Sequence, residues 1–578
     1  MSDKKVPDNQ RRSALFKQGP LRAAQRSLLR GMGLDDDTIY QPFVGVVSTQ
    51  GEMSPCNIKL KDQVEQAKLG IYGSGGTPRE FNTISVSDGL VNGHSGMHYS
   101  LISREVIADS VEVVVRAHQY DALFCIGACD KNFPAMMMAM VRLNVPAIFL
   151  NGGTTIPGTH KGERVEIKTI AEALGRYVKQ EVSVEELDAL SQDAWPAPGC
   201  CPGQFTANTM GMVAEVLGLA MLGSAAIPAV YSQRLAVARQ SGKLLMDALN
   251  NNGPLPRELV TRKSLENACA AVAATGGSTN AALHIPAIAN EAGIDFDIDD
   301  IARVFARTPL IANLSPSGPY LIKDLYDIGG YPVVFKELLR GGFLHGDCLT
   351  ISGETLDEAL RDTPAADGNV VLSVDTPRST SGGLVVLKGN LCPQGALIKS
   401  AGLDATYHKG IAKVFTSEED CIKAVLAREI KSGMTIIIRG EGPKGGPGMR
   451  ELVTVTALLY GMGMGENVTL ITDGRFSGVS RGFCIGYVSP EFAAGGPIGL
   501  VRDGDTIEVD LKQAEVNLRI TDEQWQQRVE EQAQQPIEPN LIATTGVAGK
   551  YVNTVGPASQ GAITHKGGKP WPFEDGVL

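Results

Sequence analysis

Long apolar runs are missing from this sequence, and so is any excess of positive charge. No apolar stretch approaches the about 20 residues that a membrane-spanning helix needs. The start, MSDKKVPDNQRRSALF, carries charges where a secretory signal would have its apolar segment. Lys and Arg number 53 against 64 Asp and Glu, so the formal net charge is −11. These absences argue against nucleic acid or a membrane as partner, and we expect a cytoplasmic protein.

Cysteine and histidine are also scarce. Ten cysteines in 578 residues are too few for a disulfide scaffold. No CxxC pair repeats at zinc-ribbon spacing, and no HExxH motif occurs, which disfavours a zinc-dependent hydrolase. We expect His94, His98 and His160 to be hydrogen-bonded structural residues. The cysteines of such a chain are core thiols, metal ligands or catalytic groups.

The composition that is present fits a soluble globular enzyme of two domains. Apolar residues make up 43% and charged residues 20%, and 578 residues exceed one ordinary core. Residues 1–370 alternate apolar strands, such as ALFCIGA and VPAIFLNGG, with helical stretches, which predicts a doubly wound α/β domain. Residues 375–578 are rich in strands, and DTIEVDL and EVNLRIT predict a hairpin. We therefore expect an N-terminal doubly wound α/β domain and a C-terminal β-barrel-like α+β domain.

Three cysteine positions differ from the others because each stands before a predicted helix. Cys56 precedes NIKLKDQVEQAKLG, Cys129 precedes PAMMMAMVRLN, and the pair Cys200–Cys201 precedes FTANTMGMVAEVLG. The free N–H groups at a helix start favour thiolate over thiol. Three such thiolates meeting at one point would hold a metal centre and leave one position open for a substrate. The spacing does not decide between Cys200 and Cys201, and Cys125 is predicted to be a core residue.

Candidate oxygen ligands stand in other loops. Asp88 ends an apolar alternation, Asp130 and Lys131 adjoin the second of these cysteines, and the glycine-rich GEGPKGGPG leads to Glu451. The segment LITDGRFSG likewise places a glycine-containing loop after an apolar run, and this loop contains Ser477. Carboxylates at strand ends suit Mg²⁺, although each acid alone also suits a turn or a cap. The glycine-rich loop could instead cradle a phosphate, but it lacks the GxxxxGK[ST] order of a P-loop.

Eight motifs, in this order along the chain, resemble the dihydroxy-acid dehydratase and sugar-acid dehydratase family, from about residue 12 to about residue 563. They are SPCNIKL, EFNTISVSDG, YSLISREVIADSVE, CIGACDKNFPAMMMA, FTANTMGMVAE, GGSTNAALH, EGPKGGPGMRE and TDGRFSG. The resemblance implies a barrel-like domain that closes over an α/β domain, and a homodimer or homotetramer. It implies ligands of a [2Fe–2S] cluster, which are Cys56, Cys129 and Cys201. It implies ligands of Mg²⁺, which are Asp88, Asp130, a carbamylated Lys131 and Glu451. It implies one catalytic base, Ser477.

The implied activity is that of a hydro-lyase, which dehydrates a 2,3-dihydroxy carboxylic acid to a 2-keto acid. The segment ATTGVAGKYVNTVGPASQGAIT favours the branched-chain type, acting on 2,3-dihydroxyisovalerate in branched-chain amino acid synthesis. A sugar-acid dehydratase for an aldonate or glycerate is the alternative. An alternative of another class is a non-catalytic iron–sulfur binding or regulatory protein, which would have no need of a base at Ser477.

Two segments depart from the family pattern and bear on the substrate. The chain reads Gly199-Cys-Cys-Pro-Gly-Gln204 where relatives commonly read Gly-x-Cys-Gly-Gly-Met, and Pro202 removes one backbone N–H. It reads Ser477-Gly-Val-Ser480 where relatives commonly read Ser-Gly-Gly-Thr, so Val479 is expected to reshape the substrate pocket.

Overall fold

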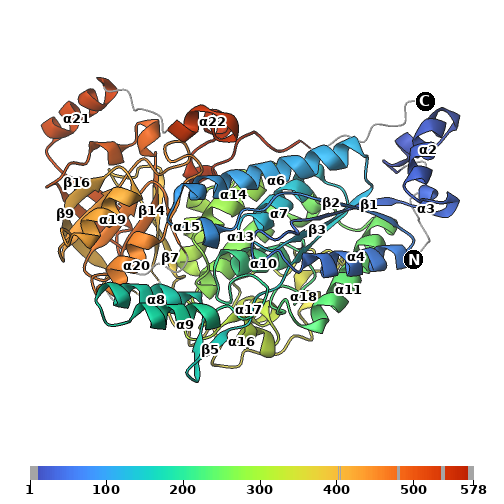
Figure 1. Cartoon of the computed structure of the whole chain (residues 1–578), viewed down its shortest axis with the longest axis horizontal. Coiled ribbons are helices and arrows are strands. Elements are labelled where there is room, and N and C mark those ends of the chain that lie inside the picture. The colour runs from blue at the N-terminus through green and yellow to red at the C-terminus, as the bar shows by residue number, and fades with distance from the viewer. Residues whose placement is uncertain (1–10, 401–402, 404, 478–481, 535–540, 570–578) are drawn as a thin grey trace.

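The structure is a computed structural model of the whole chain, described here for residues 11–400, 403, 405–477, 482–534 and 541–569. Its N-terminal half is built on a four-stranded parallel sheet in the order β2-β1-β3-β4 (Figure 1). The strands are β1 (Phe43–Ser48), β2 (Thr77–Asn82), β3 (Ala122–Gly127) and β4 (Ala147–Asn151). No helix within the described ranges is long and apolar enough to cross a membrane.

Helices connect these strands and cover both faces of the sheet. The connections are α4 (Leu60–Gly73), α6 (His98–Ala117) and α7 (Asn132–Leu143). The strand order reverses at β1, so right-handed crossovers place α4 on one face and α6 with α7 on the other. Helix α4 packs on α11 (Ser232–Asn250), and α6 packs on α7. The predicted doubly wound α/β domain is confirmed.

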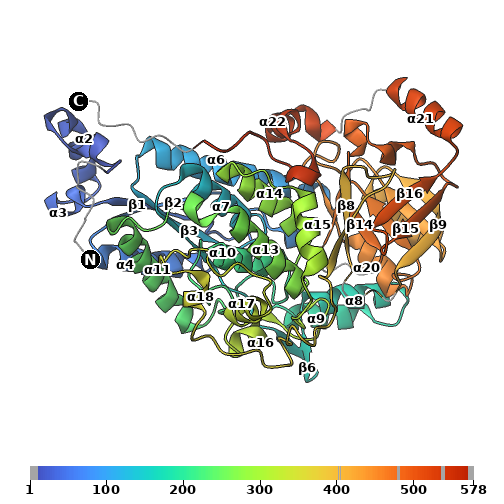
Figure 2. The same ribbon diagram turned by 180° about the vertical axis from the view of Figure 1, so that it is seen from behind.

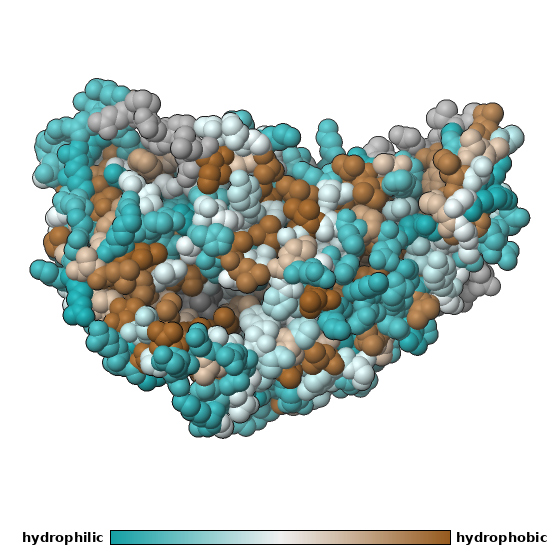
Figure 3. Space-filling view, viewed as in Figure 1, coloured by the Kyte–Doolittle hydropathy of each residue, from teal (hydrophilic) through white to brown (hydrophobic). Residues whose placement is uncertain are grey.

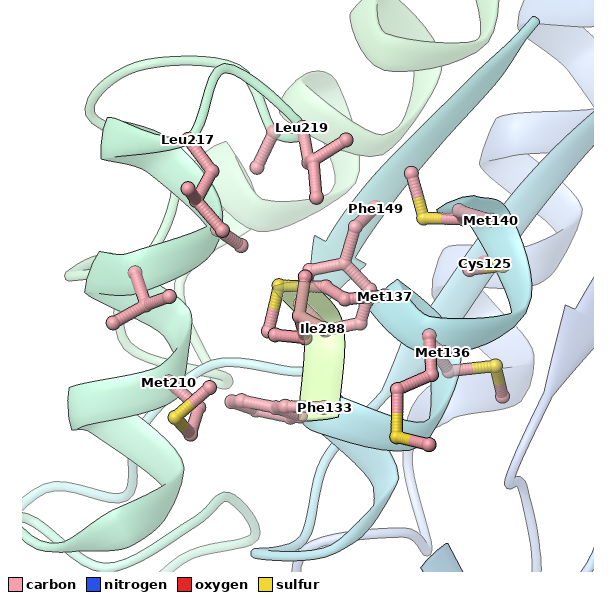
Figure 4. Close-up of a cluster of buried hydrophobic side chains, with 14 of the residues drawn as sticks. Cys125, Phe133, Met136, Met137, Met140, Phe149, Met210, Leu217, Leu219 and Ile288 are labelled. Atoms are coloured by element: carbon pink, nitrogen blue, oxygen red, sulfur yellow. The ribbon is translucent and has the colours of Figure 1, made fainter. Parts of the chain in front are cut away.

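Helix α7 shows why these residues form the core of this half. All of its residues are buried, because it lies between the sheet and two further helices, α10 (Thr206–Val216) and α14 (Ala281–Ala292). Its flexible methionines fill the irregular space against Phe149 and Met210 (Figure 4). Cys125 of β3 is completely buried in this cluster, which confirms that it is a core residue.

The remaining longer helices of this half do not connect strands of that sheet. They are α2 (Ala23–Gly31), α8 (Ile167–Val178), α9 (Val184–Asp193), α13 (Arg262–Thr275), α15 (Ile298–Arg307) and α17 (Tyr331–Arg340). Helix α2 projects at the far end of the molecule from the strand-rich half (Figure 1).

The C-terminal half is an eight-stranded mixed sheet, ordered β16-β15-β9-β10-β12-β14-β8-β7. The strands are β7 (Leu384–Leu387), β8 (Gly395–Lys399), β9 (Tyr407–Phe415), β10 (Met434–Ile438), β12 (Thr469–Thr472), β14 (Cys484–Ser489), β15 (Thr506–Asp510) and β16 (Glu515–Arg519). The two edges meet, because Val516 N donates to Lys388 O at 2.7 Å and Lys388 N donates to Ala514 O at 2.8 Å. The sheet therefore nearly closes into a barrel, and the predicted hairpin is the antiparallel pair β15–β16.

Three further helices belong to the C-terminal half. They are α19 (Glu418–Leu426), α20 (Thr454–Gly461) and α21 (Asp522–Gln534). Helices α19 and α20 pack together, and α20 also packs against α8 of the other half. Apolar residues reach the surface where the two halves meet, whereas the projection around β5 (Gly158–His160) is hydrophilic (Figure 3).

The chain returns from the barrel to the α/β half near its C-terminus (Figures 1 and 2). Beyond α22 (Gly546–Thr554), residues 561–569 lie along α6 and α14, and we name them the C-terminal strap. Arg104 of α6 donates to the carbonyl oxygens of Gly561 and Ala562 at 2.9 and 2.7 Å. His565 forms an ion pair with Glu291 of α14 at 3.0 Å. The strap is irregular as far as Lys569, and residues 570–578 lie outside the described part.

The His565–Glu291 ion pair makes strap docking depend on pH. The hydrogen bond to Glu291 raises the pKa of His565 above its ordinary 6.5. The ion pair therefore makes its full contribution to the stability of the folded protein below the ordinary pKa of 6.5. This contribution is lost as pH rises through the raised pKa of His565. Bonds to His565 and Arg142 outweigh burial and lower the pKa of Glu291, so its charge persists down to below the ordinary 4.5.

Replacing His565 by Gln should therefore lower the unfolding temperature at about pH 6 and leave it almost unchanged at about pH 9. The loss should be about 1 kcal/mol or less, because the imidazole is 34% exposed and solvent screens the pair. Thermal unfolding of both proteins across this range measures it. An equal difference at both pH values would show that the ion pair is not its cause.

Candidate active site

The predicted ligands of the N-terminal half gather at the carboxyl edge of the parallel sheet. Cys56 follows β1, Asp88 follows β2, and Cys129, Asp130 and Lys131 follow β3. The carboxyl ends of parallel strands share one edge, and a crevice opens there where the strand order reverses. Here that point lies between β1 and β3, so the fold itself brings residues from three separate connections together.

The structure distinguishes Cys200 from Cys201. Thr154, just after β4, pairs with Cys200 and draws this loop to the same sheet edge. Cys200 is fully buried, and its Sγ donates to Asn208 Oδ1 at 3.3 Å. Cys201 is partly exposed, and Asn208 Nδ2 holds its carbonyl oxygen at 2.6 Å. Cys200 is therefore committed to a contact inside the protein, and Cys201 is the more accessible thiol.

The thiols of this edge act on one another electrostatically. The hydrogen bond with Cys56 and then burial raise the pKa of Cys129 well above its usual range. Burial and then the charge of Asp130 do the same to Cys201, with a contribution from Cys129. Such thiols stay protonated unless a cation takes the place of their protons. These thiols are therefore suited to binding a metal and poorly suited to acting as free nucleophiles.

The acidic side chains beside the thiols form a second donor set. Lys131 is fully buried and forms an ion pair with Asp88 Oδ2, which also accepts from Ser100 Oγ at 2.8 Å. Asp88 Oδ1 is buried and has no hydrogen-bond partner among the described residues. Burial and then the neighbouring charge of Asp88 raise the pKa of Asp130 to about 7, against the opposing effect of Lys131. A buried carboxylate oxygen without a partner and a second acid held near neutrality both indicate a place for a cation.

The predicted strand-to-loop position of Asp88 is wrong. Strand β2 ends at Asn82, and Asp88 instead begins the short helix α5 (Asp88–Val91). The pairing of β2 with β1 stops at Asn82 opposite Ser48, where β1 itself ends. The apolar alternation that continues to Asp88 therefore lacks a neighbouring strand to pair with.

Glu451 and Ser477 come from neighbouring segments of the barrel half. Glu451 opens the two-residue strand β11 (Glu451–Leu452), which pairs in parallel with β13 (Arg475–Phe476). Ser477 follows β13 directly, and its backbone N–H donates to Leu452 O at 3.4 Å. The predicted base thus follows the strand that pairs with the strand of the predicted barrel ligand, two residues beyond the position opposite Glu451. Val479 and Ser480, the departures after the base, lie outside the described residues.

The backbone N–H groups of the glycine-rich loop before Glu451 bind carboxylates of the protein itself, so they do not form a phosphate site. The N–H groups of Lys444 and Gly445 donate to the Glu491 carboxylate at 2.9–3.0 Å. A second buried carboxylate, Asp473, accepts from the N–H groups of Gly440 and Glu441 at 3.1 and 2.9 Å. These internal acids fix the loop and thereby the position of Glu451.

Asn280 connects the two halves, and sequence reasoning gave it no role. Its Nδ2 donates to Thr206 Oγ1 at 2.8 Å and to Glu451 Oε2 at 3.3 Å. Its Oδ1 accepts from Arg475 Nη1 at 2.7 Å and from the Tyr487 hydroxyl at 3.0 Å. The motif GGSTNAALH was the available signal, because Asn280 stands at the start of α14 within it.

Arg475 and Tyr487 are further site residues that the sequence did not reveal. Arg475 is fully buried, donates to Glu451 Oε2 at 3.0 Å, and donates through Nε to Met449 O at 2.8 Å. Tyr487 holds a backbone φ of +64°, which is unusual for so bulky a residue. Both constraints serve to hold the barrel loops against Asn280 and the α/β half.

The histidines behave as predicted. His98 Nδ1 lies 2.8 Å from Gly446 O, His160 Nδ1 lies 2.7 Å from Asp193 Oδ2, and His94 Nδ1 accepts from Gly96 N at 3.0 Å. Across the described ranges, no three His, Cys, Asp or Glu side chains already converge closely enough to hold one metal ion. A metal would therefore have to draw the donors of each set together.

Fold and site together define an enzyme of α/β and barrel halves that both supply residues to one site. Comparison with known sequences sets the family: the chain belongs to the dihydroxy-acid/6-phosphogluconate dehydratases, which are hydro-lyases. The N-terminal family model matches residues 41–359 and the C-terminal one residues 369–562.

Three relatives show how far this similarity extends. The chain is 55% identical to Dihydroxy-acid dehydratase 2 of Bordetella bronchiseptica, over 97% of this chain and 98% of that protein. It is 52% identical to Dihydroxy-acid dehydratase 3 of Bradyrhizobium diazoefficiens, over 97% and 96%. It is 44% identical to the dihydroxy-acid dehydratase of Sulfurisphaera tokodaii, over 96% and 99%.

Replacing Asn280 by Ala should lower both stability and activity. The change removes four buried hydrogen bonds at the contact between the halves and leaves donors of Arg475 and Tyr487 without their acceptor. We expect a loss of about 3 kcal/mol, measured by urea unfolding. Asn290→Ala, a change of the same type on the same helix but at the strap, should leave activity near normal. Wild-type activity in the Asn280 variant would exclude the connecting role.

Proposed function

We propose that this chain is a dihydroxy-acid dehydratase that converts 2,3-dihydroxyisovalerate to its 2-keto acid in branched-chain amino acid synthesis. The observation that carries the proposal is the meeting of a thiol set and a carboxylate set at one sheet edge, with Ser477 and Glu451 on a pair of neighbouring barrel segments. Relatives that are 50–55% identical over nearly the whole chain bear the name dihydroxy-acid dehydratase. A cytoplasmic homodimer or homotetramer is part of the same proposal.

Cys56, Cys129 and Cys201 would hold a [2Fe–2S] cluster. The residues present fit this group, because the three thiols belong to loops that meet at one edge and act on one another's ionisation. Iron–sulfur clusters are held by cysteine thiolates. The commitment of Cys200 to Asn208 supports Cys201 as the third ligand.

Asp88, Asp130, Glu451 and a carbamylated Lys131 would hold Mg²⁺. Mg²⁺ takes oxygen ligands, and the unpartnered Asp88 Oδ1 and the raised pKa of Asp130 fit such an ion. Carbamylation converts the buried Lys131 ammonium into an anionic oxygen donor, so the residue would change from a competitor of the cation into a ligand.

Dehydration requires loss of the C2 proton and of the C3 hydroxyl of the substrate. When bound, the cluster supplies a Lewis acid for the leaving hydroxyl, and Mg²⁺ supplies positive charge beside the C2 oxygen and the carboxylate. Ser477 Oγ, acting as the alkoxide, removes the C2 proton as general base and becomes the neutral hydroxyl. Arg475, two residues before it, is a buried cation that favours negative charge at this place. Asn280 and Arg475 keep Glu451 oriented, and the enol that leaves becomes the keto acid.

An assay of keto-acid release tests the proposal and the substrate together. Anaerobically prepared protein should act on 2,3-dihydroxyisovalerate at least about tenfold more efficiently, as kcat/KM, than on glycerate, gluconate or pentonates. Iron and sulfide should each be about two per chain. A preference for an aldonate would replace the branched substrate by a sugar acid. Iron-bearing protein without turnover on any of these acids would favour a binding or regulatory role.

Replacing Ser477 by Ala should reduce kcat about a thousandfold while iron and magnesium contents stay normal, because only the proton acceptor is removed. Steady-state kinetics and metal analysis of the purified variant measure this. Ser417→Ala, which removes only a helix cap in the same half, is the matched control. A Ser477→Ala enzyme with near-normal turnover would remove this serine from its role.

A further inference from the structure

A fully buried arginine stands behind the cysteine loops and has no function in the proposed mechanism. Arg234, in the first turn of α11, donates through Nη2 to Asn151 Oδ1 at 3.0 Å, Ser224 O at 2.8 Å and Ile227 O at 2.7 Å. Its Nε and Nη1 are buried without a hydrogen-bond partner among the described residues. Two orphaned donors on a guanidinium that is 0% exposed require an explanation.

Arg234 also lacks an acidic partner in direct contact. Within the part of the chain that the structure describes, it makes no ion pair. The carboxylate that influences it, Glu215, uses its oxygens for the N–H groups of Gly223 and Ala225, at 3.0 and 2.5 Å. Burial lowers the pKa of Arg234 to about 10, which reflects how poorly its charge is solvated. A buried cation without a paired anion is strongly unfavourable unless an anion lies within reach.

The hydrogen bonds of Arg234 lead directly to the cysteine loop. Asn151 Oδ1, which accepts from Arg234, also accepts from Gly153 N at 2.8 Å. Gly153 O in turn accepts from Cys200 N at 3.0 Å. Arg234 is therefore connected to the loop of Cys200 and Cys201 by hydrogen bonds that pass through Asn151 and Gly153.

We propose that Arg234 is the buried counter-cation of the cysteine centre. Its charge, which has no ion-pair partner among the described residues, is balanced when Cys56, Cys129 and Cys201 hold an anionic iron–thiolate cluster. Arg234 touches neither substrate nor iron in this assignment, so it is a positioning residue that acts through charge. The inference rests on the proposed function, since it requires that a cluster is bound.

Two consequences distinguish a counter-cation from a residue that only fills space. Loss of the positive charge should make the reduction potential of the cluster more negative, because adding an electron then meets less compensation. Loss of the charge should also weaken retention of iron, as outer-shell changes commonly do by about tenfold or more. A neutral side chain loses the three hydrogen bonds of Arg234 Nη2 with or without metal, so the part of the destabilisation that comes from the charge should appear in the cluster-bound protein alone.

The test compares Arg234→Gln and Arg234→Met with Arg234→Lys, which keeps the charge. Arg239→Gln is the matched control, since Arg239 lies on the same helix but is exposed, and its guanidinium donates to Gln66 Oε1. Anaerobically loaded proteins are examined by spectroelectrochemical titration and by the rate of iron loss to a chelator. Thermal unfolding and near-ultraviolet circular dichroism are recorded for the loaded and the metal-free forms.

We expect both neutral variants to show a more negative potential and about tenfold faster iron loss, and the Lys variant and the control to resemble wild type. A wild-type potential in the neutral variants would overturn the proposal, as would a Lys variant that behaves like them. Neutral variants whose unfolding temperature falls equally with and without the cluster would also overturn it. If the wild-type protein itself binds no cluster, the proposed function fails; if only the variants show no effect, the inference alone fails.

Discussion

A buried accumulation of thiol and carboxylate groups at one sheet edge is the constraint on which the rest of this structure depends. The negative charges of Asp88 and Glu451 act on Asp130. Within the N-terminal set, Lys131 is the cation that counteracts them. Cys56 and Cys129 add groups that become anionic when they bind metal. Acidic groups so close together are stable only if protons or cations neutralise them. In the chemistry that we assign to the site, metal cations neutralise these acidic groups.

The barrel half completes this arrangement through a small number of directed contacts. Arg475 brings a cation to Glu451, and Asn280 holds both against the α/β half. The C-terminal strap is fixed to the α/β half by Arg104 and by His565. Because the proposed ligands come from both halves, the contact between the halves is itself part of the proposed site.

The sequence predicts local elements well because their signals are local. Strand β3, helix α7 and strand β4 follow from apolar runs with Pro134 in the first helical turn, and the hairpin β15–β16 follows from two alternating segments. The end of β2 could not be predicted in this way, because it is set by where its neighbour β1 ends. The roles of Asn280 and Arg234 depend on contacts between residues far apart in the chain. The choice between Cys200 and Cys201 needed the bond to Asn208, which no spacing reveals.

An anomalous difference map recorded at the iron absorption edge tests the central claim most directly, using crystals of anaerobically prepared protein. Our account predicts iron bonded to the sulfur atoms of Cys56, Cys129 and Cys201, with Cys200 still directed at Asn208. Iron at any other set of cysteines, or a crevice occupied by iron that is held through Cys200, would contradict it.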